Sequence, residues 1–103
     1  MGEPGLPKID TLIHAPVRLA IVSTLISVEE AEFGYLKTVT GASDGNLSTH
    51  LSKLEEGGMI SIEKTFRGKK PLTVCRLTDR GRAAFKTYLA DLERILKRNQ
   101  TGK

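Results

Sequence analysis

Cysteine and histidine are scarce in this chain. Its 103 residues include one cysteine, Cys75, and two histidines, His14 and His50, which are widely separated in the sequence. A lone thiol cannot form an internal disulfide, and these three side chains lack the close spacing of metal ligands. We therefore expect a fold held together by packing, with no metal and no cofactor, in which Cys75 is a buried small hydrophobe rather than a redox switch.

Long apolar runs are also absent. No stretch approaches the ~18 residues that a membrane span requires, and the chain starts with Pro4, Gly5 and Pro7 rather than with a basic stretch and an apolar one. We therefore expect a soluble, cytoplasmic protein that contacts no membrane. The sequence also has no nucleophile–base pair, no glycine-rich phosphate loop and no paired catalytic carboxylates, so we expect no catalytic residue and no enzyme activity.

The chain is long enough for one compact domain and too short for two of ordinary size. We place this domain at 9–98, between a flexible start at 1–8 and a flexible tail at 99–103. The formal net charge is +4, yet seven basic residues and one acidic residue lie between Lys64 and Arg82. A basic stripe on a mildly acidic body is typical of a nucleic-acid-binding face, and a solvated surface is the alternative.

Two helices are predicted in the first part of the chain. The first covers about 16–27, where Pro16 suits the opening turn of a helix. Its apolar residues occur on nearly all sides, which predicts burial on more than one side. The second helix covers about 33–39 and is stopped by Gly41.

A third helix is predicted at about 44–56. Ser43 can cap its amino end, and Gly57-Gly58 ends it because glycine accepts the left-handed conformation that closes many helices. On a helical wheel three leucines form a narrow inward stripe, Leu47, Leu51 and Leu54. The opposite face is small, polar and nearly free of acidic residues, and consists of Gly45, Asn46, Ser48, Thr49, Ser52 and Lys53.

A β-hairpin and a long helix complete the expected elements. The alternating segment 59–66 and the extended run 72–77 flank a loop at 67–71 that contains glycine and proline. Thr78 is placed to cap a last helix at about 79–98. The fold class is therefore mainly α with a small β-hairpin (α+β), in the element order of a winged helix-turn-helix with a two-stranded wing.

This order predicts a function in binding double-stranded DNA. The polar face of the third helix can approach base edges in the major groove, and the cations of the hairpin can contact phosphates. The predicted DNA-binding residues are Ser43, Gly45, Asn46, Ser48, Thr49, Ser52 and Lys53 near the third helix and Lys64, Arg67, Lys69 and Lys70 in the wing.

Three stretches resemble the winged-helix transcriptional regulators of the MarR and ArsR types. They are DGNLSTHLSKLEEGG at 44–58, EKTFRGKKP at 63–71 and LTDRGR at 77–82. The resemblance implies a DNA-binding dimer, with its recognition helix at 44–56 and its wing tip at 67–70. The resemblance does not say whether a small-molecule effector exists, and the chain lacks the cysteine pairs of the metal-sensing relatives.

The last helix carries an apolar stripe that we expect to form a homodimer interface, because it exceeds what so small a core can cover. Its predicted interface residues are Phe85, Tyr88, Leu89, Leu92, Ile95 and Leu96. Packing of the same stripe onto the first helix of its own chain is an alternative, and both can hold at once.

Two further alternatives remain open. His50 lies at the margin of the inward stripe, which favours a packed or hydrogen-bonded histidine over a DNA contact, and His14 has no recognisable partner. The whole domain could instead be a protein-binding winged helix whose basic stripe serves an acidic partner. The acid-poor face of the third helix and the charge of the wing argue against that interpretation.

Overall fold

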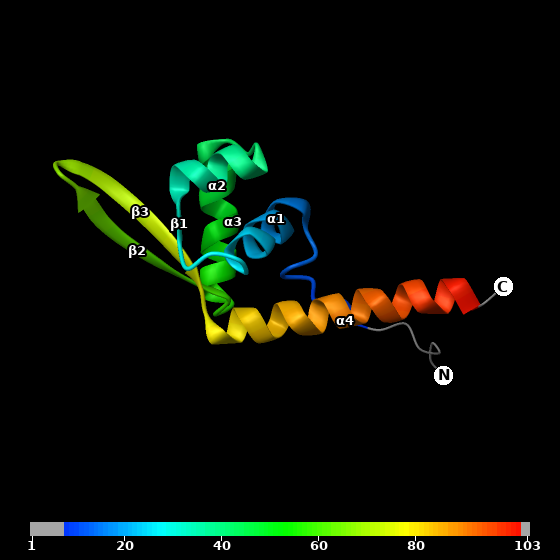
Figure 1. Ribbon diagram of the computed structural model, residues 1–103. Helices are drawn as coiled ribbons and strands as arrows, with labels where there is room; N and C mark the ends of the chain where they lie inside the picture. The colour runs from blue at the N-terminus through cyan, green and yellow to red at the C-terminus, as the bar shows by residue number, and fades with distance from the viewer. Residues whose placement is uncertain (1–7, 102–103) are drawn as a thin grey trace.

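The computed structural model describes the backbone of residues 8–101 and the side chains of residues 8–98. In this part of the chain it contains four helices and three strands, in the order α1 (Pro16–Leu25), β1 (Ala31–Glu32), α2 (Phe33–Thr40), α3 (Asp44–Glu56), β2 (Ile60–Arg67), β3 (Lys70–Leu77) and α4 (Asp79–Thr101). The expected α+β class and winged-helix element order are confirmed (Figure 1).

The ends of the chain differ in part from the expectation. Residues 1–7 and 102–103, where we expected flexible segments, lie outside the described residues. The predicted tail at 99–103 is helical up to Thr101, because α4 continues past its predicted end. In the described part of the chain, no helix is both long and apolar enough to cross a membrane.

Local backbone signals set the turn between α2 and α3. Gly41 closes α2 in the left-handed conformation, with a φ of 71°, and its N–H donates to the Lys37 carbonyl at 2.9 Å. The Ser43 hydroxyl then caps α3 by accepting the Asn46 N–H at 3.2 Å. At the other end of α3, Gly58 has a φ of 77°, which suits glycine. The predicted stop and cap signals of α3 are therefore confirmed.

The hairpin turn is tighter than predicted. β2 pairs with β3 from Ile60 opposite Leu77 to Arg67 opposite Lys70, so only two residues form the turn. The first of them, Gly68, has a φ of 63°. A two-residue turn with positive φ at its first residue matches the natural twist of paired strands. The predicted loop is too long because both strands continue their pairing up to this turn.

The sheet has a third strand that the sequence did not predict. β1 pairs with β3, placing Ala31 opposite Cys75 and Glu32 opposite Val74, and the strand order is β1-β3-β2. The predicted two-stranded wing is confirmed as β2 and β3, and β1 adds a third, short strand beside β3. Two residues are too few to show the alternation by which strands are recognised in a sequence.

The core lies between the three short helices and the base of the sheet. The predicted inward stripe of α3 is confirmed, since Leu47, Leu51 and Leu54 are at most 3% exposed. They pack in one cluster with Ile13, Ile21, Val22, Leu25, Leu36, Met59, Ile60, Cys75, Phe85 and Tyr88. Because this cluster anchors α3 from behind, the opposite face of the helix is held outward.

A hydrogen-bonded junction fixes the start of α4. The Thr78 hydroxyl caps the helix by accepting the Gly81 N–H at 2.9 Å, as predicted, and it donates to the Gly58 carbonyl at 2.6 Å. The Thr78 N–H also donates to the Met59 carbonyl at 3.0 Å. The first turn of α4 is therefore joined to the chain between α3 and β2.

The first half of α4 lies against the domain, and its second half extends beyond the other helices (Figure 1). Two of the predicted dimer residues belong to the protomer's own core, because Phe85 is 7% exposed and Tyr88 is 1% exposed. The Tyr88 hydroxyl lies 2.9 Å from His14 Nδ1, which gives His14 the partner that its sequence context did not reveal. We therefore remove Phe85 and Tyr88 from the predicted interface.

Candidate nucleic-acid interface

The outward face of α3 carries the first group of predicted contact residues. All of them are exposed: Gly45, Asn46, Ser48, Thr49, Ser52 and Lys53, together with Ser43 just before the helix. Asp44 is the acid in the first turn, and it pairs with Lys37 at 2.7 Å. No other carboxylate lies between Asp44 and Glu55. This part of the helix surface can therefore approach a polyanion closely.

The hairpin has two faces with different chemistry. Cross-strand partners share a face, so Lys64 with Thr73 and Phe66 with Pro71 lie on what we call the inner face, which is directed toward α3. The alternate residues form the outer face: Glu63, Thr65 and Arg67 on β2, and Lys70, Leu72, Val74 and Arg76 on β3.

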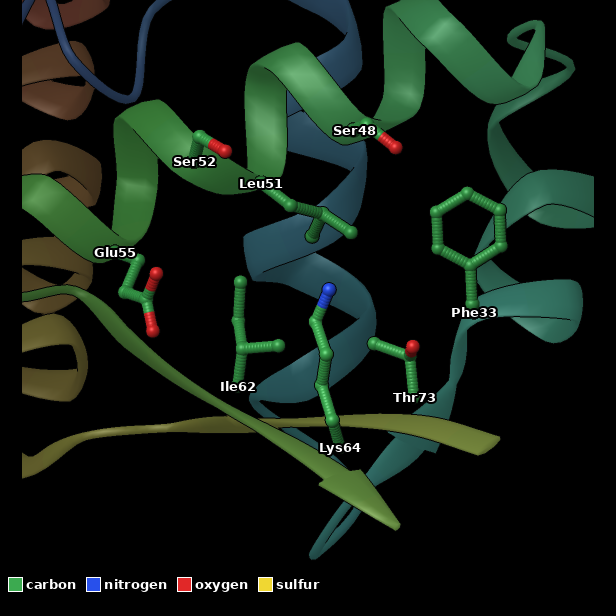
Figure 2. A pocket seen from close by; sticks show the side chains of 8 residues that line it. All are labelled: Phe33, Ser48, Leu51, Ser52, Glu55, Ile62, Lys64 and Thr73. Carbon is green, nitrogen blue, oxygen red and sulfur yellow. The ribbon is translucent and has the colours of Figure 1, made fainter. Parts of the chain in front are cut away.

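A cleft of about 210 Å³ separates α3 from the inner face. Leu51 and Ile62 supply apolar walls, and Figure 2 shows Lys64 extending from β2 toward α3. The other lining residues are Phe33, Ser48, Ser52, Glu55 and Thr73. The cleft thus brings Lys64 of the wing next to Ser48 and Ser52 of the helix, which are far apart in the sequence.

The arginines of the outer face form ion pairs. Arg67 pairs with Glu32 through both of its terminal nitrogens, and this hydrogen bond raises the pKa of the Arg67 guanidinium. Arg76 lies 2.9 Å from Glu63 and 2.5 Å from Glu30. These carboxylates neutralise part of the basic stripe, so its local charge is smaller than the sequence suggested.

A family model for a winged helix DNA-binding domain matches residues 17–96. The match covers most of the chain and includes α3, the hairpin and most of α4. The chain belongs to the winged helix DNA-binding domain family.

The chain is also similar to several individual proteins. An uncharacterized protein of Methanocaldococcus jannaschii is 36% identical over 86 residues, which are 84% of this chain and 94% of that protein. A transcriptional regulator homologue from Pyrococcus horikoshii superimposes with a TM-score of 0.79 at 30% identity, over 85% of this chain and 87% of its own. The transcriptional repressor BigR from Xylella fastidiosa gives a TM-score of 0.59 at 30% identity, over 78% and 74% of the two chains.

Three wing cations of this winged helix domain have no acidic partner. Among the described residues, no carboxylate lies within ion-pair distance of Lys64, Lys69 or Lys70. Lys64 belongs to the inner face, and Lys69 lies in the turn. These three predicted residues therefore present charge to solvent, whereas Arg67 is shared with Glu32.

Arg18, which was not among the predicted site residues, joins α3 to the segment that precedes α1. The Arg18 guanidinium lies 2.9 Å from His50 Nδ1 and donates to the carbonyls of Leu12, at 2.5 Å, and Thr11, at 3.3 Å. Burial, Arg18 and Lys53 together lower the pKa of His50. His50 is thus the hydrogen-bonded structural histidine that we expected. Its partner is distant in sequence, so no local pattern could have identified Arg18.

Cys75 is fully buried in the core, as predicted. Burial, with a smaller contribution from Glu55, raises the pKa of its thiol to about 11. The thiol therefore stays protonated at neutral pH and is a poor nucleophile. The described residues also contain no group of three or more histidine, cysteine and carboxylate side chains that could hold a metal ion.

Proposed function

We propose that this winged helix protein is a transcriptional regulator that binds double-stranded DNA in a sequence-specific manner as a homodimer. In this proposal α3 lies in the major groove, and the wing contacts the neighbouring backbone. The observation that carries it is the exposed polar face of α3, which has no carboxylate between Asp44 and Glu55, beside three wing cations without acidic partners. The Pyrococcus and Xylella relatives, a transcriptional regulator homologue and a transcriptional repressor, support the same role.

The first experiment is a selection of preferred sequences from random duplexes about 30 base pairs long, which span about three helical turns. Binding of the selected duplex and of random duplex is then measured at about 50 mM and about 200 mM salt. A sequence-specific protein prefers the selected duplex, and both affinities fall steeply with salt because phosphate contacts release counterions. Binding with no preference for any sequence, or no binding at all, would support the protein-binding alternative.

Two cations of the wing, Lys69 and Arg67, are expected to contribute differently to DNA affinity. Lys69→Ala should weaken binding to selected and random duplexes by the same factor and reduce the salt slope by about one unit, because it removes one phosphate contact. Arg67→Ala should have a smaller effect, since Arg67 must first give up Glu32. Both variants are compared by fluorescence anisotropy over a salt series. Equal losses for the two variants would show that the Arg67–Glu32 pair does not persist on DNA.

Gly45 provides a test on α3. It is exposed in the first turn, and a Cβ built there meets no atom within 4 Å, so packing within the protomer does not require glycine. Gly45→Ala should raise the free energy of unfolding by about 0.5–1 kcal/mol, as expected of alanine in a helix. We expect the same variant to bind the selected duplex about tenfold more weakly, because the added methyl group blocks close approach to DNA.

The matched control is Gly34→Ala on α2, where a Cβ also meets nothing within 4 Å. It should raise stability by a similar amount and leave DNA binding unchanged. Unfolding is followed by circular dichroism in urea, and binding by anisotropy. If Gly45→Ala bound DNA as well as the wild-type protein, α3 would not approach DNA through its first turn.

A further inference from the structure

Phe66 is a large aromatic side chain in solvent. It is 68% exposed, more than any other large hydrophobic residue in the described part of the chain. Its cross-strand partner on the inner face is Pro71, which is also exposed, so the outer end of this face is apolar. Burial of an aromatic ring is favourable in free energy. An exposed ring does not gain this free energy unless a binding partner covers it. The fold does not use this ring, and the contacts proposed above do not include it.

The charges around Phe66 indicate what kind of partner it fits. Lys64 precedes it on the inner face, Lys69 follows it in the turn, and Lys70 begins β3 on the outer face. As described above, none of these three cations has an acidic partner. An apolar ring between unpaired cations complements a polyanion whose charges border an apolar surface. The minor groove of duplex DNA has this character, because phosphates line both sides of the sugars and base edges.

The wing extends from α3 in the direction of an adjacent groove. Lys64 lies at the cleft under α3, and Phe66 is two residues further out, or about 7 Å at the rise of a strand. The turn at Gly68 lies about 13 Å beyond Lys64 on the same scale. Adjacent major and minor grooves are separated by half a helical turn, about 17 Å. With α3 in the major groove, the inner face leads from the shared backbone toward the next minor groove.

We propose that Phe66, supported by Pro71, is an apolar wedge that enters the minor groove next to the major groove occupied by α3. The proposal rests on the DNA-binding function above and adds a site to it. Lys64 contacts the phosphates between the two grooves, and Lys69 in the turn contacts the phosphates of the far strand. The ring partly unstacks one base step and bends the duplex, as other minor-groove wedges do. Flexible pyrimidine–purine steps should therefore be preferred at this position.

The test compares Phe66→Ala with Phe66→Leu and with Thr65→Ala. Leucine keeps an apolar side chain at position 66, and Thr65 is the neighbour on the outer face of the same strand. The selected duplex carries 2-aminopurine, whose fluorescence rises on unstacking, about half a helical turn outward from the centre of each half-site. A second copy of the duplex carries dyes at its two ends, so that energy transfer reports bending. Affinity is measured by anisotropy over the same salt series.

We expect the wild-type protein to raise the 2-aminopurine signal and to bring the duplex ends closer. Phe66→Ala should abolish both signals and weaken binding about tenfold, which is within the range for aromatic–base stacking. Its salt slope should stay unchanged, in contrast to Lys69→Ala, because no cation is removed. Phe66→Leu should retain most of the unstacking signal, and Thr65→Ala should behave as the wild-type protein does.

Several results would overturn the wedge. If Phe66→Ala bound, unstacked and bent the duplex as the wild-type protein does, the wedge would be wrong while DNA binding stood. If Phe66→Ala lowered the sedimentation coefficient of the free protein, the ring would belong to a contact between copies. A wild-type protein that binds no duplex at either salt concentration would overturn the wedge and the proposed function together. Because Phe66 is exposed, the alanine variant should keep the wild-type melting curve.

Discussion

Replacing Gly81 with alanine is expected to lower the free energy of unfolding by about 3 kcal/mol or more. A Cβ at this position would lie 2.1 Å from the Met59 carbonyl oxygen and 2.8 Å from the Leu77 side chain. The same Met59 carbonyl accepts the Thr78 N–H at 3.0 Å, so the backbone cannot move away without disturbing the cap of α4. Since small domains are stable by about 5–15 kcal/mol, such a loss is a large fraction of the total.

The Gly34→Ala variant is the matched control for this prediction as well. It makes the same chemical change near the start of another helix, with no atom within 4 Å of the added carbon, and should be slightly stabilising. Urea unfolding at one protein concentration keeps the comparison independent of association. If Gly81→Ala were as stable as Gly34→Ala, α4 could shift freely against the Met59 backbone, and the junction would not fix its direction.

Sequence reasoning succeeded where the signal was local. The Ser43 cap, the Gly41 stop and the Thr78 cap each depend on residues within four positions, and all three form as predicted. The inward leucines of α3 follow from helical periodicity alone. These elements position the outward face of α3, so the part of the candidate site that lies on this helix could be placed from the sequence.

The remaining features depend on contacts that no local pattern encodes. Arg67 meets Glu32 and Arg76 meets Glu30 because the short β1 joins the sheet beside β3. A count of charges along the sequence cannot show such pairing, and it therefore overstated the free charge of the wing. The division of the hairpin into an inner and an outer face likewise needs the strand register, which a one-residue slip would invert.

The apolar stripe of α4 has a buried part and an exposed part, which the sequence pattern did not distinguish. Its first part, Phe85 and Tyr88, is covered by the protomer's own core. Further along, Leu89 is 48% exposed and Leu96 is 61% exposed, while Leu92 is partly buried against the core. These leucines follow the spacing of a helix seam, and the second half of α4 extends beyond the body of the domain (Figure 1). A second copy that presents the same surface would cover them symmetrically.

We therefore expect Leu89→Glu combined with Leu96→Glu to convert a wild-type dimer into a monomer. In a symmetric dimer the double substitution removes four leucines and places four carboxylates in the seam. Burial of a leucine contributes about 1.5–3 kcal/mol when complete, so partial burial of four should amount to about 4 kcal/mol, or roughly a thousandfold in the dissociation constant. Sedimentation equilibrium over a range of protein concentrations measures this change directly.

The matched control is Thr87→Glu combined with Ala90→Glu, which adds the same charge to exposed positions of α4 outside the stripe and should leave the dimer intact. The consequence for DNA follows from symmetry. A dimer reads two half-sites about one helical turn or a multiple apart, so the monomeric variant should bind one half-site alone and lose the dependence of affinity on half-site spacing. A wild-type protein that is monomeric at high concentration, yet still requires two correctly spaced half-sites, would show that the seam forms elsewhere or only on DNA.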